Sequence, residues 1–145
     1  MSATTEQLER NFTHRFLTSL RRINSPDSKT TTTHAAGLVI RRRSLRIKRA
    51  AYSSMARAAG SHRAWTRALL SRARSQRRRQ QHDVHRRRQG REMGRAGKLR
   101  GLVPGGSRME MGQLLEETAH YVQCLAVQVR VMQAVADHFS SSSSM

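Results

Sequence analysis

The residues with the clearest capacity for chemistry are a few histidines and one cysteine. His120 and Cys124 lie four positions apart, which places both on one face of a helix, and His82, Asp83 and His85 form a second cluster. His120 and Cys124 are only two ligands with no third nearby, which is too few for a zinc site, and the second cluster lies in a flexible basic segment. Neither group therefore predicts a metal centre. We expect Cys124 to be a surface thiol and the second cluster to be solvated. We predict no enzyme, no cofactor and no metal.

Arginine and lysine give the chain its dominant property. The 145 residues include 28 Lys and Arg against 9 Asp and Glu, a net charge of +19. Residues 41–100 hold 21 of these basic residues and only two acidic ones, so the two flanks are neutral on balance. Such density is typical of polyanion contact or nuclear import. The candidate nuclear-localisation residues are Arg41, Arg42, Arg43, Lys48 and Arg49, and we expect a nuclear protein.

Three helices are predicted in the first half of the chain. The first has apolar residues at the helical period, namely Leu8, Phe12, Phe16, Leu20 and Ile23. It could also be a mitochondrial presequence, but Glu6 and Glu9 oppose this interpretation because presequences are poor in acids. The second is a basic helix over 38–59 that Gly60 can end. The third carries Trp65, Leu69 and Ala73, which we interpret as a packing face. A single-strand binder would interleave several aromatics with its basic residues.

The strongest periodic signal lies near the C-terminus. The apolar positions alternate at steps of four and three through Met111, Leu115, Thr118, Val122, Leu125, Val129, Met132, Ala136 and Phe139. This is a sustained heptad pattern, and a second row of Leu114, Tyr121 and Val135 makes the apolar face wider than a two-stranded zipper needs. So long a face cannot be covered by the small remainder, and a partner helix is implied.

A shorter apolar repeat precedes it, ending in Leu99, Leu102 and Val103. Pro104 then ends that helix, because the residue before a proline is disfavoured in the α region. The pattern therefore predicts a helix, a short loop and a long helix. Spacing alone leaves open an αα-hairpin inside an ordinary helical bundle.

At these residues the sequence resembles the basic helix–loop–helix proteins. Residues 98–106 resemble the end of helix 1 and the loop of that family, and residues 114–122 and 125–132 resemble its helix 2. Residues 48–56 and 63–70 are similar to a narrower group, the plant atypical members of the increased-leaf-inclination-binding type. The resemblance implies a nuclear transcriptional regulator that represses brassinosteroid-linked cell elongation by pairing with other helix–loop–helix proteins.

The basic region departs from the DNA-reading members of the large family. Counting back from Leu102 without a gap puts His85 where those members carry a base-reading glutamate, and an imidazole lacks the two acceptors of a carboxylate. If this count contained a one-residue gap, His82 and Asp83 would become candidates for the base-reading positions. Contact with phosphates needs only positive charge. We therefore expect weak or no specific DNA binding, with nonspecific contact from Arg86, Arg87 and Arg88.

We thus predict an all-α chain whose helix–loop–helix forms a parallel four-helix bundle with a partner, after flexible basic N-terminal segments. The segments are a short amphipathic helix (1–24), a linker (25–37), a basic helical segment (38–80), a degenerate basic region plus helix–loop–helix (81–139) and a disordered tail (140–145). The predicted dimerisation residues are Leu99, Leu102, Val103, Leu115, Val122, Leu125, Val129 and Met132. We expect Glu117 to face outward.

The predicted partners are other helix–loop–helix or basic helix–loop–helix proteins, as heterodimers or in a homodimer, and no membrane. Pairing would block the DNA binding of the partner. The alternative function is sequence-nonspecific nucleic-acid binding through residues 41–100, and a third interpretation is an organellar protein.

Overall fold

The computed structural model describes residues 2–25, 36–78 and 94–142, and every regular element within these ranges is a helix. The elements are α1 (Ser2–Asn24), α2 (Ala36–Ala58), α3 (Ala64–Arg78), α4 (Arg95–Leu102), the 3₁₀ turn η1 (Gly106–Arg108) and α5 (Met111–Ser142). The all-α prediction is confirmed. None of the helices in these ranges has the length and apolarity that a membrane span requires.

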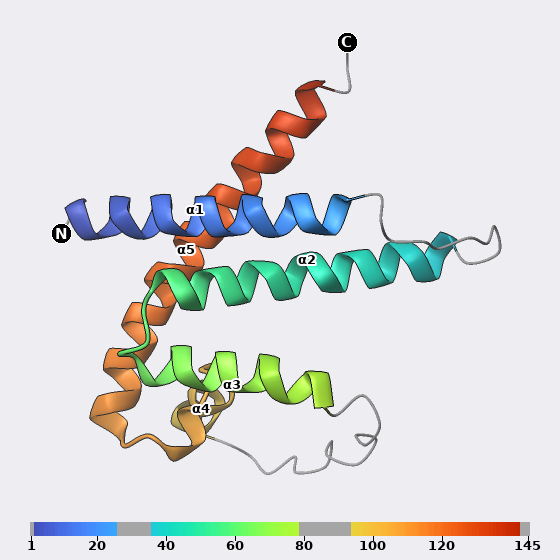
Figure 1. Cartoon of the computed structure of the whole chain (residues 1–145). Helices are drawn as coiled ribbons and strands as arrows, with labels where there is room; N and C mark the ends of the chain where they lie inside the picture. Colours follow the sequence, from blue (N-terminus) through green and yellow to red (C-terminus); the bar gives the residue numbers. More distant parts are fainter. Residues whose placement is uncertain (1, 26–35, 79–93, 143–145) are drawn as a thin grey trace.

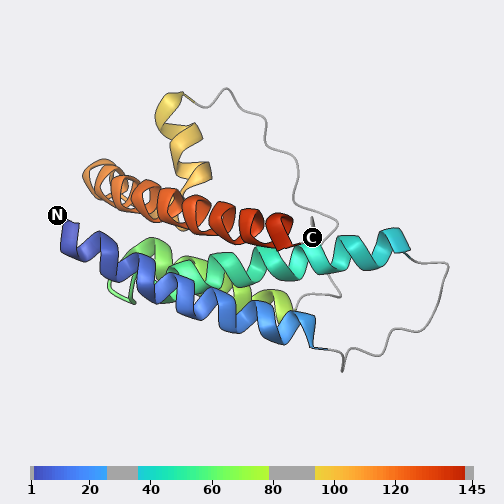
Figure 2. The same ribbon diagram turned by 90° about the horizontal axis from the view of Figure 1, so that it is seen from above.

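Helices α1, α2 and α3 form one layer, and α5 crosses that layer. The three helices follow one another in alternating directions, and α5 runs obliquely across them (Figure 1). Seen from above, α5 lies on one side of the layer (Figure 2), and it contacts α1, α2 and α3. The short α4 lies beside η1, where the chain turns into α5.

The predicted N-terminal helix is confirmed, and its apolar row enters the core. Phe12 and Phe16 are buried and their rings stack with centroids 5.4 Å apart. Leu8 and Leu20 pack at the edge of the same cluster. An ion pair of 2.9 Å between Glu9 and Arg130 also joins α1 to α5. The row that could have marked a presequence is therefore part of the folded core.

Within the basic segment 38–80, the predicted break at Gly60 is present and separates α2 from α3. This glycine has a φ of +85°, a left-handed conformation that favours glycine, and it follows the end of α2. The turn sends α3 back along α2. It also places Trp65 in the core with no exposed surface, which confirms that Trp65 is a packing residue.

Two side chains of α5 lie differently from the prediction. Cys124 is buried, not a surface thiol, and Glu117 is buried, not outward-facing. Both expectations were wrong because they took the heptad row, covered by a partner helix, to be the buried face of α5 and the positions between its members to be exposed. In the structure, α5 is rotated so that Leu114, Glu117 and Cys124 face the layer.

Helix α5 is also longer than predicted. It continues through Ser142, so Ser140–Ser142 differ from the predicted tail. Their hydroxyls donate hydrogen bonds to backbone carbonyls four residues earlier, as between Ser140 and Ala136. These bonds are compatible with a helix, although serine has a modest helix propensity.

A substitution at Gly105 tests the turn between α4 and α5. Its φ is +79°, and a Cβ atom there would lie 2.9 Å from the Cβ of Ala68. We expect Gly105→Ala to lower the free energy of unfolding by about 1–3 kcal/mol, through left-handed strain and overlap with α3. Urea unfolding followed by the fluorescence of Trp65 measures this.

Gly112 provides the matched control. A Cβ atom there meets nothing within 4 Å, and the residue lies in the first turn of α5. Gly112→Ala should leave stability unchanged or raise it by up to ~1 kcal/mol. Equal stability of Gly105→Ala and the wild-type chain would contradict the turn described here.

Candidate protein-interaction surface

Trp65 joins α3 to α5 through three contacts. Its backbone N–H donates a hydrogen bond of 3.0 Å to Oε2 of Glu117. Its indole N–H donates a second one, of 3.1 Å, to Nδ1 of His120. Its ring also packs against that of Tyr121, with centroids 4.9 Å apart. The contacts on Glu117, His120 and Tyr121 fix the rotation of α5 about its own axis.

The Glu117 carboxylate acts as a cap supplied by another helix. Trp65 is the second residue of α3, where backbone N–H groups have no partner within their own helix. A carboxylate at this end also interacts favourably with the positive end of the helix dipole. Beside it, Arg63 forms an exposed ion pair of 2.7 Å with Glu116. Two consecutive glutamates of α5 thus hold the start of α3.

The pKa values of two titratable groups next to this cap, His120 and Cys124, are shifted by their surroundings. Burial, helped by the positive charge of Arg63, lowers the pKa of His120. This agrees with its geometry, because Nδ1 can accept the indole hydrogen bond only when it carries no proton. Burial also raises the pKa of the Cys124 thiol to about 11, and its Sγ lies 3.8 Å from Nδ1 of His120.

Both groups make structural contacts: His120 accepts the indole hydrogen bond of Trp65, and Cys124 is buried in the core. A thiol with a raised pKa is a poor nucleophile and a poor metal ligand at neutral pH. Within residues 2–25, 36–78 and 94–142, no three His, Cys, Asp or Glu side chains are grouped to hold a metal ion. The cluster at His82, Asp83 and His85 lies outside the described residues.

With one face of α5 packed on the layer, the opposite face presents an apolar row to solvent. The exposed row is Met111, Leu115, Val122 and Val129, at steps of four, seven and seven. The exposed fractions of its last three members are 55%, 56% and 64%. Large aliphatic side chains in line on a helix are a familiar form of protein-binding surface. The exposed row is the candidate interaction surface of this chain.

The predicted dimerisation residues are divided between exposed positions and the core. Four of them are exposed: Leu102, Leu115, Val122 and Val129. The others contact the core: Val103 is buried, and Leu99, Leu125 and Met132 are half-buried against it. The structure therefore brings the eight residues to two different environments. The heptad spacing of α5 does not distinguish exposed members such as Leu115 from half-buried ones such as Leu125.

The short α4 is held against the start of α5 by one arginine. The guanidinium of Arg100 donates to the backbone carbonyls of Gly106, at 3.2 Å, and Met109. Val103 and Pro104 are buried, while Leu102 is 74% exposed at the end of α4. The connection between the two helices is therefore fixed, and Leu102 lies free on the surface.

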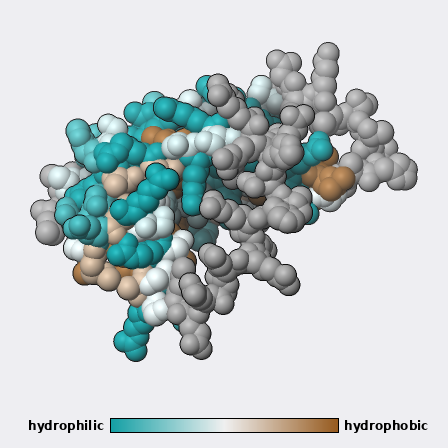
Figure 3. Space-filling view, turned by 90° about the horizontal axis from the view of Figure 1, so that it is seen from below, coloured by the Kyte–Doolittle hydropathy of each residue, from teal (hydrophilic) through white to brown (hydrophobic). Residues whose placement is uncertain are grey.

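The predicted basic residues that the structure describes lie at the surface. Arg41, Arg42 and Arg43 are exposed on α2, as are Lys48 and Arg49. Arg43 donates a hydrogen bond to the side chain of Asn24. Among the residues coloured in Figure 3, hydrophilic ones predominate on the face seen from below, and hydrophobic ones form separate patches. The predicted DNA contacts, Arg86, Arg87 and Arg88, lie outside the described residues.

Comparisons with known proteins agree with this division of the fold. The family model described as "IBH1-like, N-terminal domain" matches residues 5–77, which span nearly all of α1, α2 and α3. The chain belongs to the IBH1-like family. It is 41% identical to the protein named Transcription factor IBH1 from Oryza sativa subsp. indica, over 70% of this chain and 69% of that protein. The protein of the same name from Oryza sativa subsp. japonica matches equally well. No solved structure matches.

Membership in the family fixes the broad class of function. Its relatives are named transcription factors, so this chain is a transcriptional regulator and not an enzyme. The layer of α1–α3 is the part that the family model describes. The helix–loop–helix segment of α4, η1 and α5 follows it and packs across it.

Removing the carboxylate of Glu117 should destabilise the whole fold. Glu117→Ala leaves the buried N–H of Trp65 without an acceptor, which costs about 1–3 kcal/mol. Glu117→Gln retains an acceptor oxygen and should cost less. Urea unfolding monitored by circular dichroism measures both.

Glu116→Ala is the matched control. This neighbour is 72% exposed and only pairs with Arg63, so its loss should cost less than ~1 kcal/mol. If the Glu117 and Glu116 variants lose equal stability, the capping role of Glu117 is wrong.

Proposed function

We propose that this chain regulates transcription by pairing, through α5, with another helix–loop–helix protein and preventing that partner from binding DNA. The observation that carries the proposal is the exposed row of Met111, Leu115, Val122 and Val129 on a 32-residue helix. Apolar side chains of this size gain roughly 1.5–3 kcal/mol each when they are fully buried. A partner helix laid along the row would provide that burial.

The blocking step follows from the basic region. In basic helix–loop–helix dimers both partners place a basic helix across the major groove. This chain has a histidine, His85, at the position of the base-reading glutamate. A mixed dimer would have one half that reads the DNA site and one that does not. Losing one half-site lowers the affinity of the dimer for its site.

The biological setting of the proposal rests on the family. The resemblance to the increased-leaf-inclination-binding type implies a nuclear protein that restrains brassinosteroid-linked cell elongation. The exposed Arg41, Arg42, Arg43, Lys48 and Arg49 supply a basic cluster of the kind used for nuclear import. The predicted parallel four-helix bundle with a partner remains the proposed geometry of the dimer.

Substitutions in the exposed row can weaken pairing with a partner without changing the stability of the free chain. Val122→Glu and Val129→Glu place a charge on the proposed interface, while in the free chain both positions face water. We expect each to weaken binding to a basic helix–loop–helix protein by ~30-fold or more, equivalent to ~2 kcal/mol. The unfolding free energy should change by less than about 0.5 kcal/mol. Fluorescence anisotropy with a labelled partner measures the affinity.

Gln123→Glu is the control, because Gln123 is an exposed residue on another side of the same helix. It should bind like wild type. In a gel-shift assay, the wild-type chain should also remove the partner from its CANNTG duplex, and Val122→Glu should not. Binding of Val122→Glu with wild-type affinity would exclude the exposed row as the pairing surface.

The alternative function, nonspecific nucleic-acid binding through residues 41–100, is supported by the net charge of this window. If it operates, affinity should fall steeply with salt and should be equal within a few-fold for a CANNTG duplex and a scrambled duplex. Titrations of the two duplexes at two salt concentrations test this. A hundredfold preference for CANNTG would mean that the chain reads bases despite His85.

A further inference from the structure

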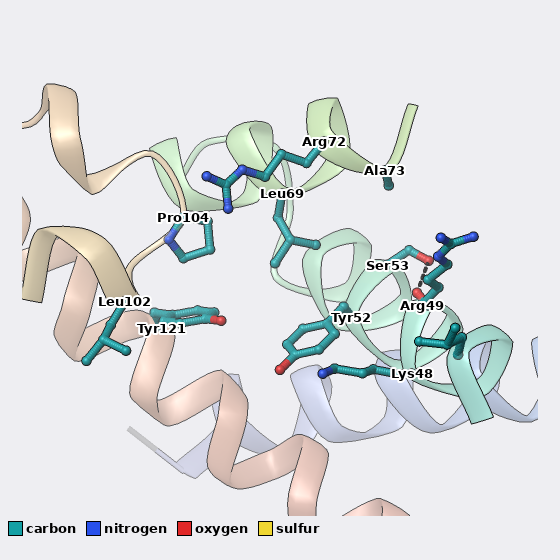
Figure 4. Close-up of a pocket in the computed structure, with 11 residues that line it drawn as sticks. Lys48, Arg49, Tyr52, Ser53, Leu69, Arg72, Ala73, Leu102, Pro104 and Tyr121 are labelled. Carbon is teal, nitrogen blue, oxygen red and sulfur yellow. Dashed lines mark hydrogen bonds between the residues drawn. The ribbon is translucent and has the colours of Figure 1, made fainter. Parts of the chain in front are cut away.

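A groove separate from the exposed row opens where the family domain meets the helix–loop–helix. It has a volume of about 480 Å³, within the range of ligand-binding pockets, and is lined by residues of α2, α3, α4 and α5. Its apolar part is formed by Tyr52, Leu69, Pro104 and Tyr121, which lie between the ribbons in Figure 4. Both tyrosines and Leu69 are half-buried. The groove is therefore a hydrophobic depression in a polar surface.

The rim of this groove is strongly positive. Lys48 and Arg49 contribute to it from α2 and Arg72 from α3 (Figure 4), and among the residues that the structure describes no aspartate or glutamate lines it. All three cations are exposed, and none has an ion pair with a carboxylate among the described residues. They also lie in the window that carries the whole net charge of the chain. An occupant must bring negative charge to the rim and an apolar group to the floor.

We propose that this groove binds an acidic amphipathic segment of another protein. Carboxylates of that segment would pair with Lys48, Arg49 and Arg72, and a leucine or aromatic side chain would enter between Tyr52, Leu69 and Tyr121. Charge complementarity of this kind directs association and selects the partner. The long Lys and Arg stems would cover the apolar anchor as their charged ends reach the carboxylates.

The same features disfavour the other occupants. A second copy of the chain would bring its own charge of +19 to a positive rim. A single strand of nucleic acid is typically bound by aromatic side chains on which successive bases stack, along a basic groove. Here the ring of Tyr121 is already packed on Trp65, and Leu69 and Pro104 provide no stacking surface.

Binding of a synthetic peptide tests the proposal on the full chain. The probe is a fluorescein-labelled amphipathic helix with glutamates on one face and leucines with one phenylalanine on the other. Lys48→Glu with Arg72→Glu should weaken binding by about tenfold or more, since each reversal replaces attraction with repulsion. The control, Arg46→Glu with Arg74→Glu, makes the same charge change on the same two helices outside the groove. It should change the affinity by less than about threefold.

Three further binding measurements could overturn the proposal. A peptide of equal charge with serines in place of its apolar residues should bind much more weakly, and equal binding would reduce the effect to nonspecific charge attraction. A short DNA duplex whose binding depended on Lys48 and Arg72 to the same extent would assign the groove to nucleic acid. Val122→Glu should bind the peptide like wild type, and its failure to do so would place the peptide on the exposed row.

Discussion

The hydrogen bond from the backbone N–H of Trp65 to the carboxylate of Glu117 sets the rotation of α5, and most of the surface follows from that rotation. A helix with a wide apolar face can pack in several orientations with similar hydrophobic burial, because burial is not directional. A buried carboxylate is different, since it must meet a donor. With Glu117 fixed on the first turn of α3, Cys124 and Val131 are turned into the core and Val122 and Val129 are turned to water.

This arrangement makes the family domain and the helix–loop–helix one structural unit. Helices α1, α2 and α3 each contact α5, and both Glu9–Arg130 and Arg63–Glu116 join the two parts through charged groups. To the buried core, α5 contributes Leu114, Cys124, Val127 and Val131, beside Phe12, Phe16, Met55 and Trp65 of the layer. Covering the layer with one side of a long helix completes that core and leaves the other side of the helix for a partner.

The sequence predicted the presence and approximate bounds of the helices, and it located the apolar row of α5. It could not predict which side of α5 faces inward, because Leu115 and Leu125 follow the same spacing, yet one is exposed and the other half-buried. Glu117 and Cys124 were misplaced for this reason. One signal was available: a buried tryptophan usually needs a partner for its indole N–H, and His120 lies one turn from Glu117. The groove beside Tyr52 is lined by residues that are far apart in the chain, so no local sequence pattern could predict it.

The division of the heptad row also constrains the proposed dimer. Leu125 and Met132 are already packed against the core, so a partner can bury only the part of each side chain that is still exposed. The gain from burial is proportional to the apolar area removed from water. Leu115, Val122 and Val129 face water before the partner arrives, so they offer the larger gain. A partner helix therefore gains most by lying along this edge of α5, offset from the centre of the heptad pattern. In that position it leaves the contacts of Trp65 with α5 intact.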